Sequence, residues 1–248
     1  MAKPRHLQHA PITEALIDIQ LSPRDTLTFT ELKNAIETVD FGYYVKSPIS
    51  EGTFAFTLAP EGKPQSAAEA TQVGLRLHSV DERFVAQFRI GGFTLSRLPP
   101  YEKWENLLEE AKRLWAIYAD TLAPKRIVRV ATRFINNLNL PLKTGESFQK
   151  YLNKLVDVPD DVPQIVETFF QRFHLVEATS GARVILTLAL DGIPAAGGIP
   201  VILDVDAFVT ATLNPADQEL WAILERLHEL KNRSFFGTIT EQAAELYQ

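Results

Sequence analysis

Arginines at even spacing are the residues of this chain whose types and positions best suit chemistry. Arg83 and Arg89 lie six residues apart in RFVAQFR, and Arg129 and Arg133 lie four apart in RIVRVATR. Because side chains an even number of residues apart point to the same side of a strand, each pair is expected to share a sheet face. Together with a neighbouring strand, the predicted face carries Arg76, His78, Arg83, Arg89, Arg129 and Arg133.

Two interpretations of this arginine-bearing face remain open. Guanidinium groups bind planar or phosphate-like anions through paired hydrogen bonds, which predicts a site for an anionic ligand, a nucleotide or an acidic segment of a partner. The other interpretation is a solvated polar face, which antiparallel sheets often have. In that case, internal salt bridges would join Glu14 or Asp18 to Arg129 or Arg133.

Two carboxylates, Asp204 and Asp206, alternate in ILDVDAF and are predicted to project from one strand face. A pair at this spacing can hold Mg²⁺ beside phosphates. No third ligand and no glycine-rich phosphate loop accompanies them in the sequence. Solvated or arginine-paired aspartates fit the pattern better, and we predict neither a metal nor any other cofactor.

The remaining polar candidates are His228 and Asn136. His228 lies on the predicted helix LERLHELK, where it is either a general base or a structural side chain. Asn136 belongs to NNLNLP, where it either satisfies backbone groups in a turn before Pro141 or contacts a ligand amide or base edge. The sequence contains no GxSxG, P-loop, GxGxxG or HExxH motif.

Phe235 and Phe236 follow the last long amphipathic segment, at a position where Gly237 is expected to end the helix. They either close the hydrophobic core or form an exposed aromatic contact for another protein.

The elements that would position these residues form one layout that occurs twice. Each half is predicted to run strand, helix, antiparallel strands and a long amphipathic helix. Helices are expected over 29–38, 101–120 and 144–158, and in a long segment that opens at Pro215; Gly91-Gly92 predicts a bend inside a strand. We therefore expect an α+β fold in two repeats, 1–123 and 124–248, packed as one compact unit. Helices would cover one face of long antiparallel sheets, in a layout similar to TATA-binding-protein-like or helix-grip folds.

Three separated stretches, APITEALIDIQL, RVATRFINNLNLP and LERLHELKNRSFFGTITEQAAEL, resemble an uncharacterised, sporadically distributed bacterial protein family of about this length. The resemblance covers essentially the whole chain. It implies bacterial origin and a shared fold, and it implies no known reaction. The matching positions are Pro11, Glu14, Arg133, Asn136, His228, Lys231, Phe235 and Thr240.

Composition limits the classes of function. The 248 residues carry a net charge of −6, which disfavours non-specific nucleic-acid binding, and the charge is evenly divided between the halves. The chain has no cysteine, so disulfides and thiolate chemistry are excluded. The N-terminus has no signal-peptide pattern and no apolar run is long enough to span a bilayer, so a cytoplasmic protein is expected.

These observations favour a non-enzymatic module that binds a protein partner, a second copy of itself or an anionic small ligand. The acidic balance of the chain suits a basic partner. The sporadic distribution implied by the resemblance would suit an antitoxin, immunity or phage-defence component. The alternative is an enzyme acting on a phosphate-bearing substrate, for which the arginines and His228 or the aspartates must converge in one pocket. Nucleic-acid binding on the sheet face is a weaker alternative.

Overall fold

One curved antiparallel sheet runs through both halves of the chain. The computed structural model describes residues 1–23, 27–57, 65–143, 146–153, 158–159, 161–190 and 198–248. Within these residues, nine strands pair in the order β2-β3-β4-β5-β1-β6-β9-β8-β7. They are β1 (Ile12–Leu21), β2 (Tyr43–Thr57), β3 (Gln65–Ser79), β4 (Phe84–Arg89), β5 (Gly92–Arg97), β6 (Ile127–Leu140), β7 (Phe169–Val176), β8 (Arg183–Leu190) and β9 (Ile199–Leu213). The central β1–β6 pair joins the N-terminal strands to the C-terminal strands.

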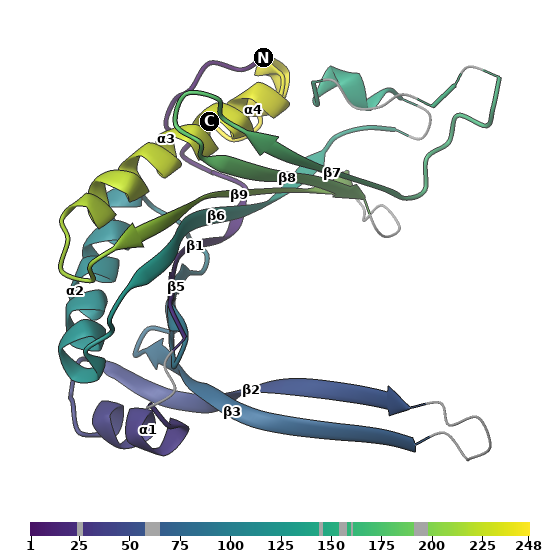
Figure 1. Cartoon of the computed structure of the whole chain (residues 1–248). Helices are drawn as coiled ribbons and strands as arrows, with labels where there is room; N and C mark the ends of the chain where they lie inside the picture. Colours follow the sequence, from purple (N-terminus) through teal and green to yellow (C-terminus); the bar gives the residue numbers. More distant parts are fainter. Residues whose placement is uncertain (24–26, 58–64, 144–145, 154–157, 160, 191–197) are drawn as a thin grey trace.

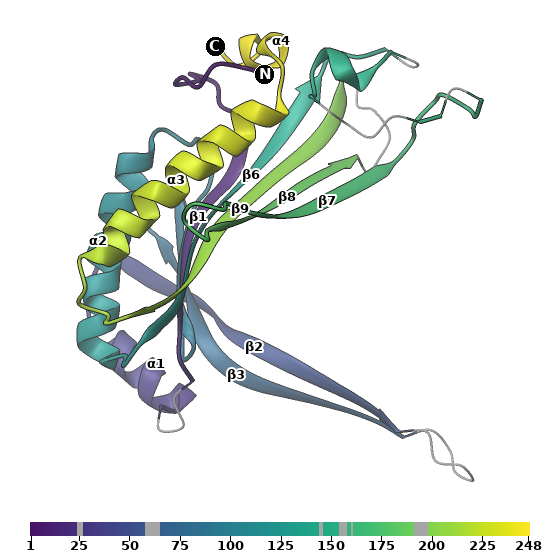
Figure 2. The same cartoon turned by 45° about the horizontal axis from the view of Figure 1, so that its top comes forward.

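The described residues also form four α-helices, and three of them cover the convex face of the sheet (Figures 1 and 2). They are α1 (Phe29–Glu37), α2 (Trp104–Leu122) and α3 (Glu219–Thr238), followed by the short α4 (Glu241–Glu245). The concave face carries none of these helices, and the β2–β3 hairpin and strands β7–β9 extend from its two ends (Figure 1). The predicted α+β class, with the long helices on one sheet face, is confirmed.

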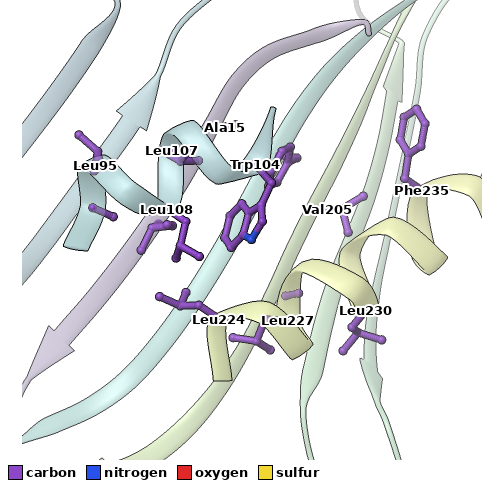
Figure 3. Packing of buried hydrophobic residues seen from close by; sticks show 14 of the residues in the cluster. Ala15, Leu95, Trp104, Leu107, Leu108, Val205, Leu224, Leu227, Leu230 and Phe235 are labelled. Carbon is purple, nitrogen blue, oxygen red and sulfur yellow. The ribbon is translucent and has the colours of Figure 1, made fainter. Parts of the chain in front are cut away.

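Alternation along the central strands explains this two-layer arrangement. On β1, Ala15, Ile17 and Ile19 are fully buried, whereas the polar Asp18 between them points to the opposite face. The amphipathic stripes of α2 and α3 complete the core against the apolar side chains of the sheet. Figure 3 shows Trp104, from the first turn of α2, standing between α2 and α3 above the strands.

Capping residues fix the starts of two helices, α1 and α4. The Thr28 hydroxyl accepts a hydrogen bond from the Glu31 amide, and the Glu31 carboxylate accepts one from the Thr28 amide at 2.8 Å. This reciprocal pair is a capping box. At α4, the Thr240 hydroxyl accepts from the Ala243 amide at 3.2 Å.

Several predicted boundaries differ from the structure. The prolines do not open the long helices: α2 begins at Trp104 and α3 at Glu219, several residues after Pro100 and Pro215. Gly91 and Gly92 do not bend one strand, because β4 ends before them and β5 begins at Gly92 to form a hairpin.

The predicted helix over 144–158 is wrong in its described part. A short 3-10 helix, Phe148–Lys150, is the helical structure there, and residues 144–145 and 154–157 lie outside the described residues. Gly237 does not end α3, which continues to Thr238. No helix among the described residues is long and apolar enough to cross a membrane.

Candidate functional site

Strand pairing brings the predicted arginines together on the concave face. Residues directly opposite each other in an antiparallel pair share a face. Arg133 is opposite Leu16 on β1 and Asp206 on β9. Arg129 is opposite Gln20, which is in turn opposite Gly92, the partner of Arg89. Arg89, Arg129 and Arg133 therefore share the concave face, as even spacing along the strands predicts.

Asp18 is the centre of an ion-pair network on this face. Its Oδ1 lies 2.8 Å from Arg89 Nη2 and its Oδ2 lies 3.1 Å from Arg129 Nη1. Thr94 donates a hydrogen bond to the same carboxylate at 2.7 Å. Arg129 continues the network through Nη2, which lies 3.0 Å from Asp206 Oδ2. The predicted internal salt bridge between Asp18 and Arg129 is present in the structure.

The two aspartates of β9 are bound to arginines. Arg133 makes a two-pronged contact with Asp204, through Nε at 2.9 Å and Nη2 at 2.7 Å. Burial raises the pKa of Asp206, although the charges of Arg129 and Arg133 oppose this shift. No group of metal-ligating side chains occurs in the described part of the chain. The arrangement matches the arginine-paired interpretation of Asp204 and Asp206.

The other three residues of the predicted arginine face differ in position. Arg76 is exposed on the concave face, and no ion pair to it occurs among the described residues. His78 lies on the same face, where its Nδ1 is 2.6 Å from Glu82 Oε2. Arg83 precedes β4 and reaches Glu102, 3.7 Å away, so it lies outside the Asp18 network. Arg83 lies just before β4, outside the regular alternation of the strand, so its even spacing from Arg89 does not place it on the same face.

Strands β7 and β8 add residues that the sequence analysis did not select. Register places Arg172 opposite Thr187, and Arg183 opposite both Val176 and Phe208, on the concave face. Both arginines are exposed, and neither has an ion pair within the described residues. The same face exposes Phe170 and Val176, which are 62% and 66% accessible. The alternation of side chains along FFQRFHLV and RVILTLAL is the sequence feature that could have identified these residues.

The opposite face of β6 leads to a cavity of about 360 Å³ between α2, α3 and the N-terminal segment. We call it the Lys231 cavity. Five of its lining residues were predicted as site residues, and the structure brings them together: Asn136, His228, Lys231, Phe235 and Phe236. Of the eight positions that carry the family resemblance, Pro11, Asn136, His228, Lys231 and Phe235 line this cavity.

A flat aromatic pair forms one wall of the cavity. The rings of Trp104 and His228 are stacked, with centroids 4.3 Å apart and planes 6° apart. Trp104 Nε1 donates to Glu225 Oε2 at 2.8 Å, which fixes the indole. Burial, with the nearby charge of Lys231, lowers the pKa of His228 to about 3. His228 is therefore neutral near pH 7, and this packing matches its structural interpretation.

Lys231 is a buried cation without a carboxylate partner in the described structure. Its side chain lies with Nζ 3.6 Å from the centroid of the Phe134 ring, and Nζ donates to Asn232 Oδ1 at 2.7 Å. Burial lowers the pKa of Lys231 to about 7. The sequence resemblance marked this position, but helical periodicity alone gives no reason to expect a buried lysine.

The sequence left two interpretations open for Asn136 and two for the pair Phe235 and Phe236, and in the structure all three side chains have structural roles. Asn136 is not in a turn: it is buried within β6, and its Nδ2 donates to the carbonyl oxygens of Phe134 and Leu203. Phe235 and Phe236 are 7% and 5% exposed, so they belong to the core and do not form an exposed patch.

The N-terminal segment closes one side of the cavity and was not predicted to take part. The Ala2 amide donates to the carbonyl oxygens of Phe236 and Ile239. Arg5 pairs with Glu241 at 2.5 Å and lines the cavity with its neighbours. The N-terminal segment is polar and has no hydrophobic periodicity, so its sequence does not indicate that it packs against the cavity.

Comparison with models of known protein families finds no match, and comparisons with curated proteins and with solved structures find none either.

Proposed function

We propose that this protein is a non-enzymatic binding module whose concave sheet face holds a partner protein with an acidic surface. The observation that carries the proposal is a set of exposed arginines, without ion pairs in the described structure, beside exposed apolar side chains on this uncovered face. Arg76 lies toward the β2–β3 end, and Arg172 and Arg183 lie toward the β7–β9 end.

Charge on the concave face supports an acidic partner, although the whole chain is acidic. Arginines exceed carboxylates among the described side chains of β1 and β3–β9 that share this face, and Glu51 of β2 adds one more carboxylate to it. The arginines are Arg76, Arg89, Arg129, Arg133, Arg172 and Arg183, and the carboxylates are Glu14, Asp18, Asp204 and Asp206. Local charge complementarity guides association and selects partners.

The exposed apolar residues match the composition of protein interfaces. The cores of protein interfaces are enriched in aromatic residues and arginine, and such residues often contribute most of the binding energy. Phe170 and the guanidinium of Arg172 lie together, 5.0 Å from ring centroid to Cζ. Such a pair offers an apolar anchor and a cation at the same point.

The pairing of the central charges favours binding over catalysis. Asp18, Asp204 and Asp206 are each held by arginines, so their carboxylates are occupied. The enzyme alternative required the arginines to converge in one pocket with His228 or with Asp204 and Asp206, and the two aspartates do meet Arg129 and Arg133 but are ion-paired to them. His228 instead lies on the helix-covered side, stacked on Trp104.

We also propose that the two halves arose by duplication, since each runs from a central strand through an antiparallel meander that returns beside it.

The proposal is tested by charge reversal at the two ends of the face. The wild-type protein and an Arg76→Glu/Arg172→Glu variant are used to capture partners from cells that produce the protein naturally. We expect one stoichiometric companion that binds the variant at least about tenfold more weakly.

Arg226→Glu is the control, because Arg226 is exposed on α3 and pairs only with Glu219 among the described residues. It should leave the affinity unchanged. Equal loss in both variants, or no loss in either, would contradict the assignment of the concave face.

A further inference from the structure

The Lys231 cavity contains a cation whose hydrogen-bonding capacity is only partly used. An ammonium group has three N–H donors. One is directed to Asn232 Oδ1 at 2.7 Å, and the face of Phe134 receives the cation at 3.6 Å. No carboxylate oxygen of the described residues lies within 4.0 Å of Lys231 Nζ. Lys231 is only 6% exposed, so it makes little contact with bulk solvent.

A second buried donor lines the same cavity. Arg5 Nε is buried without a hydrogen-bond partner, while Nη1 of the same side chain is held by Glu241 and the Lys3 carbonyl. Buried polar atoms in native structures are almost always paired. Two incompletely paired cationic side chains in one cavity leave N–H donors that an acceptor entering the cavity can use.

The surrounding side chains are already fixed in place. Asn232 joins Lys231 to His228, since its Nδ2 lies 3.4 Å from His228 Nε2 and its Oδ1 faces Lys231 Nζ. His228 is held in turn against Trp104. A site built of mutually fixed groups loses little freedom when a ligand enters.

We propose that the Lys231 cavity binds a small monocarboxylate with a flat apolar body. The carboxylate would meet Lys231, and the body would pack among Tyr101, Trp104 and Phe236, which line the cavity. A volume of about 360 Å³ is at the small end of ligand sites and fits a ring acid. This site lies on the other side of the sheet from the proposed partner face and does not depend on it.

A single negative charge is favoured over the two charges of a phosphate monoester. Arg5, Lys103 and Lys231 line the cavity together with Glu102 and Glu105, so the lining has one more cation than carboxylates when Lys231 is protonated, and one carboxylate neutralises that excess. A monocarboxylate satisfies Lys231 with the least repulsion. This charge balance distinguishes the proposal from a general anion site.

The test compares benzoate with benzamide and phenyl phosphate by isothermal titration calorimetry on the full chain. Benzoate should bind at least about tenfold more tightly than benzamide, which has the same shape without the charge. At about pH 8, benzoate binding should take up nearly one proton, because an ion pair raises the depressed pKa of Lys231. The indole N–H resonance of Trp104 should shift on binding.

Two variants test whether Lys231 is the residue that binds benzoate. Lys231→Met should weaken benzoate binding at least about tenfold and abolish proton uptake, while the protein stays folded. Lys112→Met, at an exposed position of α2, should bind as the wild type does. The proposal is overturned if benzoate fails to bind, if benzamide binds equally, if phenyl phosphate binds more tightly, or if Lys231→Met keeps wild-type affinity.

Discussion

Replacing Lys231 with methionine should make the protein more stable at neutral and mildly acidic pH. Methionine keeps the length and apolar stem of the side chain but removes the buried charge. Burial lowers the lysine pKa from its ordinary 10.5 to about 7. At 1.36 kcal/mol per pKa unit, this corresponds to a cost of about 5 kcal/mol for the charged folded form.

The sign of the pH dependence follows from which state binds the proton. Between about pH 7 and pH 10.5 the unfolded chain holds a proton on Lys231 that the folded chain has released, so wild-type stability rises with pH. Below about pH 7 both states are protonated and the folded protein carries the full cost. The lost contacts to Asn232 and Phe134 offset part of the gain, which leaves about 2–4 kcal/mol.

Urea unfolding at about pH 6, pH 8 and pH 10 measures this difference directly. We expect Lys231→Met to exceed the wild type by about 2–4 kcal/mol at the lowest pH and to approach it at the highest. Lys112→Met, exposed on α2, should show no such trend. A variant that is less stable than the wild type at pH 6, or a difference that is constant with pH, would refute the reasoning.

Three further substitutions test other parts of the structure. His228→Gln should shift the acid-unfolding midpoint to lower pH, since the folded pKa of about 3 makes wild-type stability fall from about pH 6.5 downward; an unchanged circular-dichroism titration would contradict this. Asp18→Asn should cost about 2–3 kcal/mol in urea unfolding, because it leaves Arg89 and Arg129 without their shared counter-ion; a neutral effect would mean that the network adds no stability. Thr28→Ala should cost about 1 kcal/mol by removing the α1 cap, whereas Thr28→Ser should restore it.

The fold class was predictable because the periodicity of hydrophobic residues is local. Alternation in β1 and β4, the stripe of α2 and the Thr28 capping box each appear within a few consecutive residues. The helix over 144–158 failed because apolar spacing alone does not specify whether a segment forms regular helix. Gly91 and Gly92 were ambiguous for a similar reason, since paired glycines suit both a bend and a hairpin turn.

The composition of the sites was predictable only in part. Alternation along the strands correctly placed Arg89, Arg129 and Arg133 and offered Asp18 as a partner of Arg129. It did not specify which arginine holds which of Asp204 and Asp206, because that depends on the register between strands distant in sequence. The Lys231 cavity depends on four segments that meet only in the folded chain: the N-terminal leader, β6, the start of α2 and the C-terminal half of α3. The incomplete pairing of Lys231 becomes apparent only from those tertiary contacts.

Cross-linking mass spectrometry of the native complex tests the concave-face proposal most directly. With a short cross-linker reactive toward arginine, we expect cross-links to the partner at Arg76, Arg172 and Arg183, at the two ends of the concave face. Cross-links confined to Arg113 and Arg226 on the helix-covered side would contradict it.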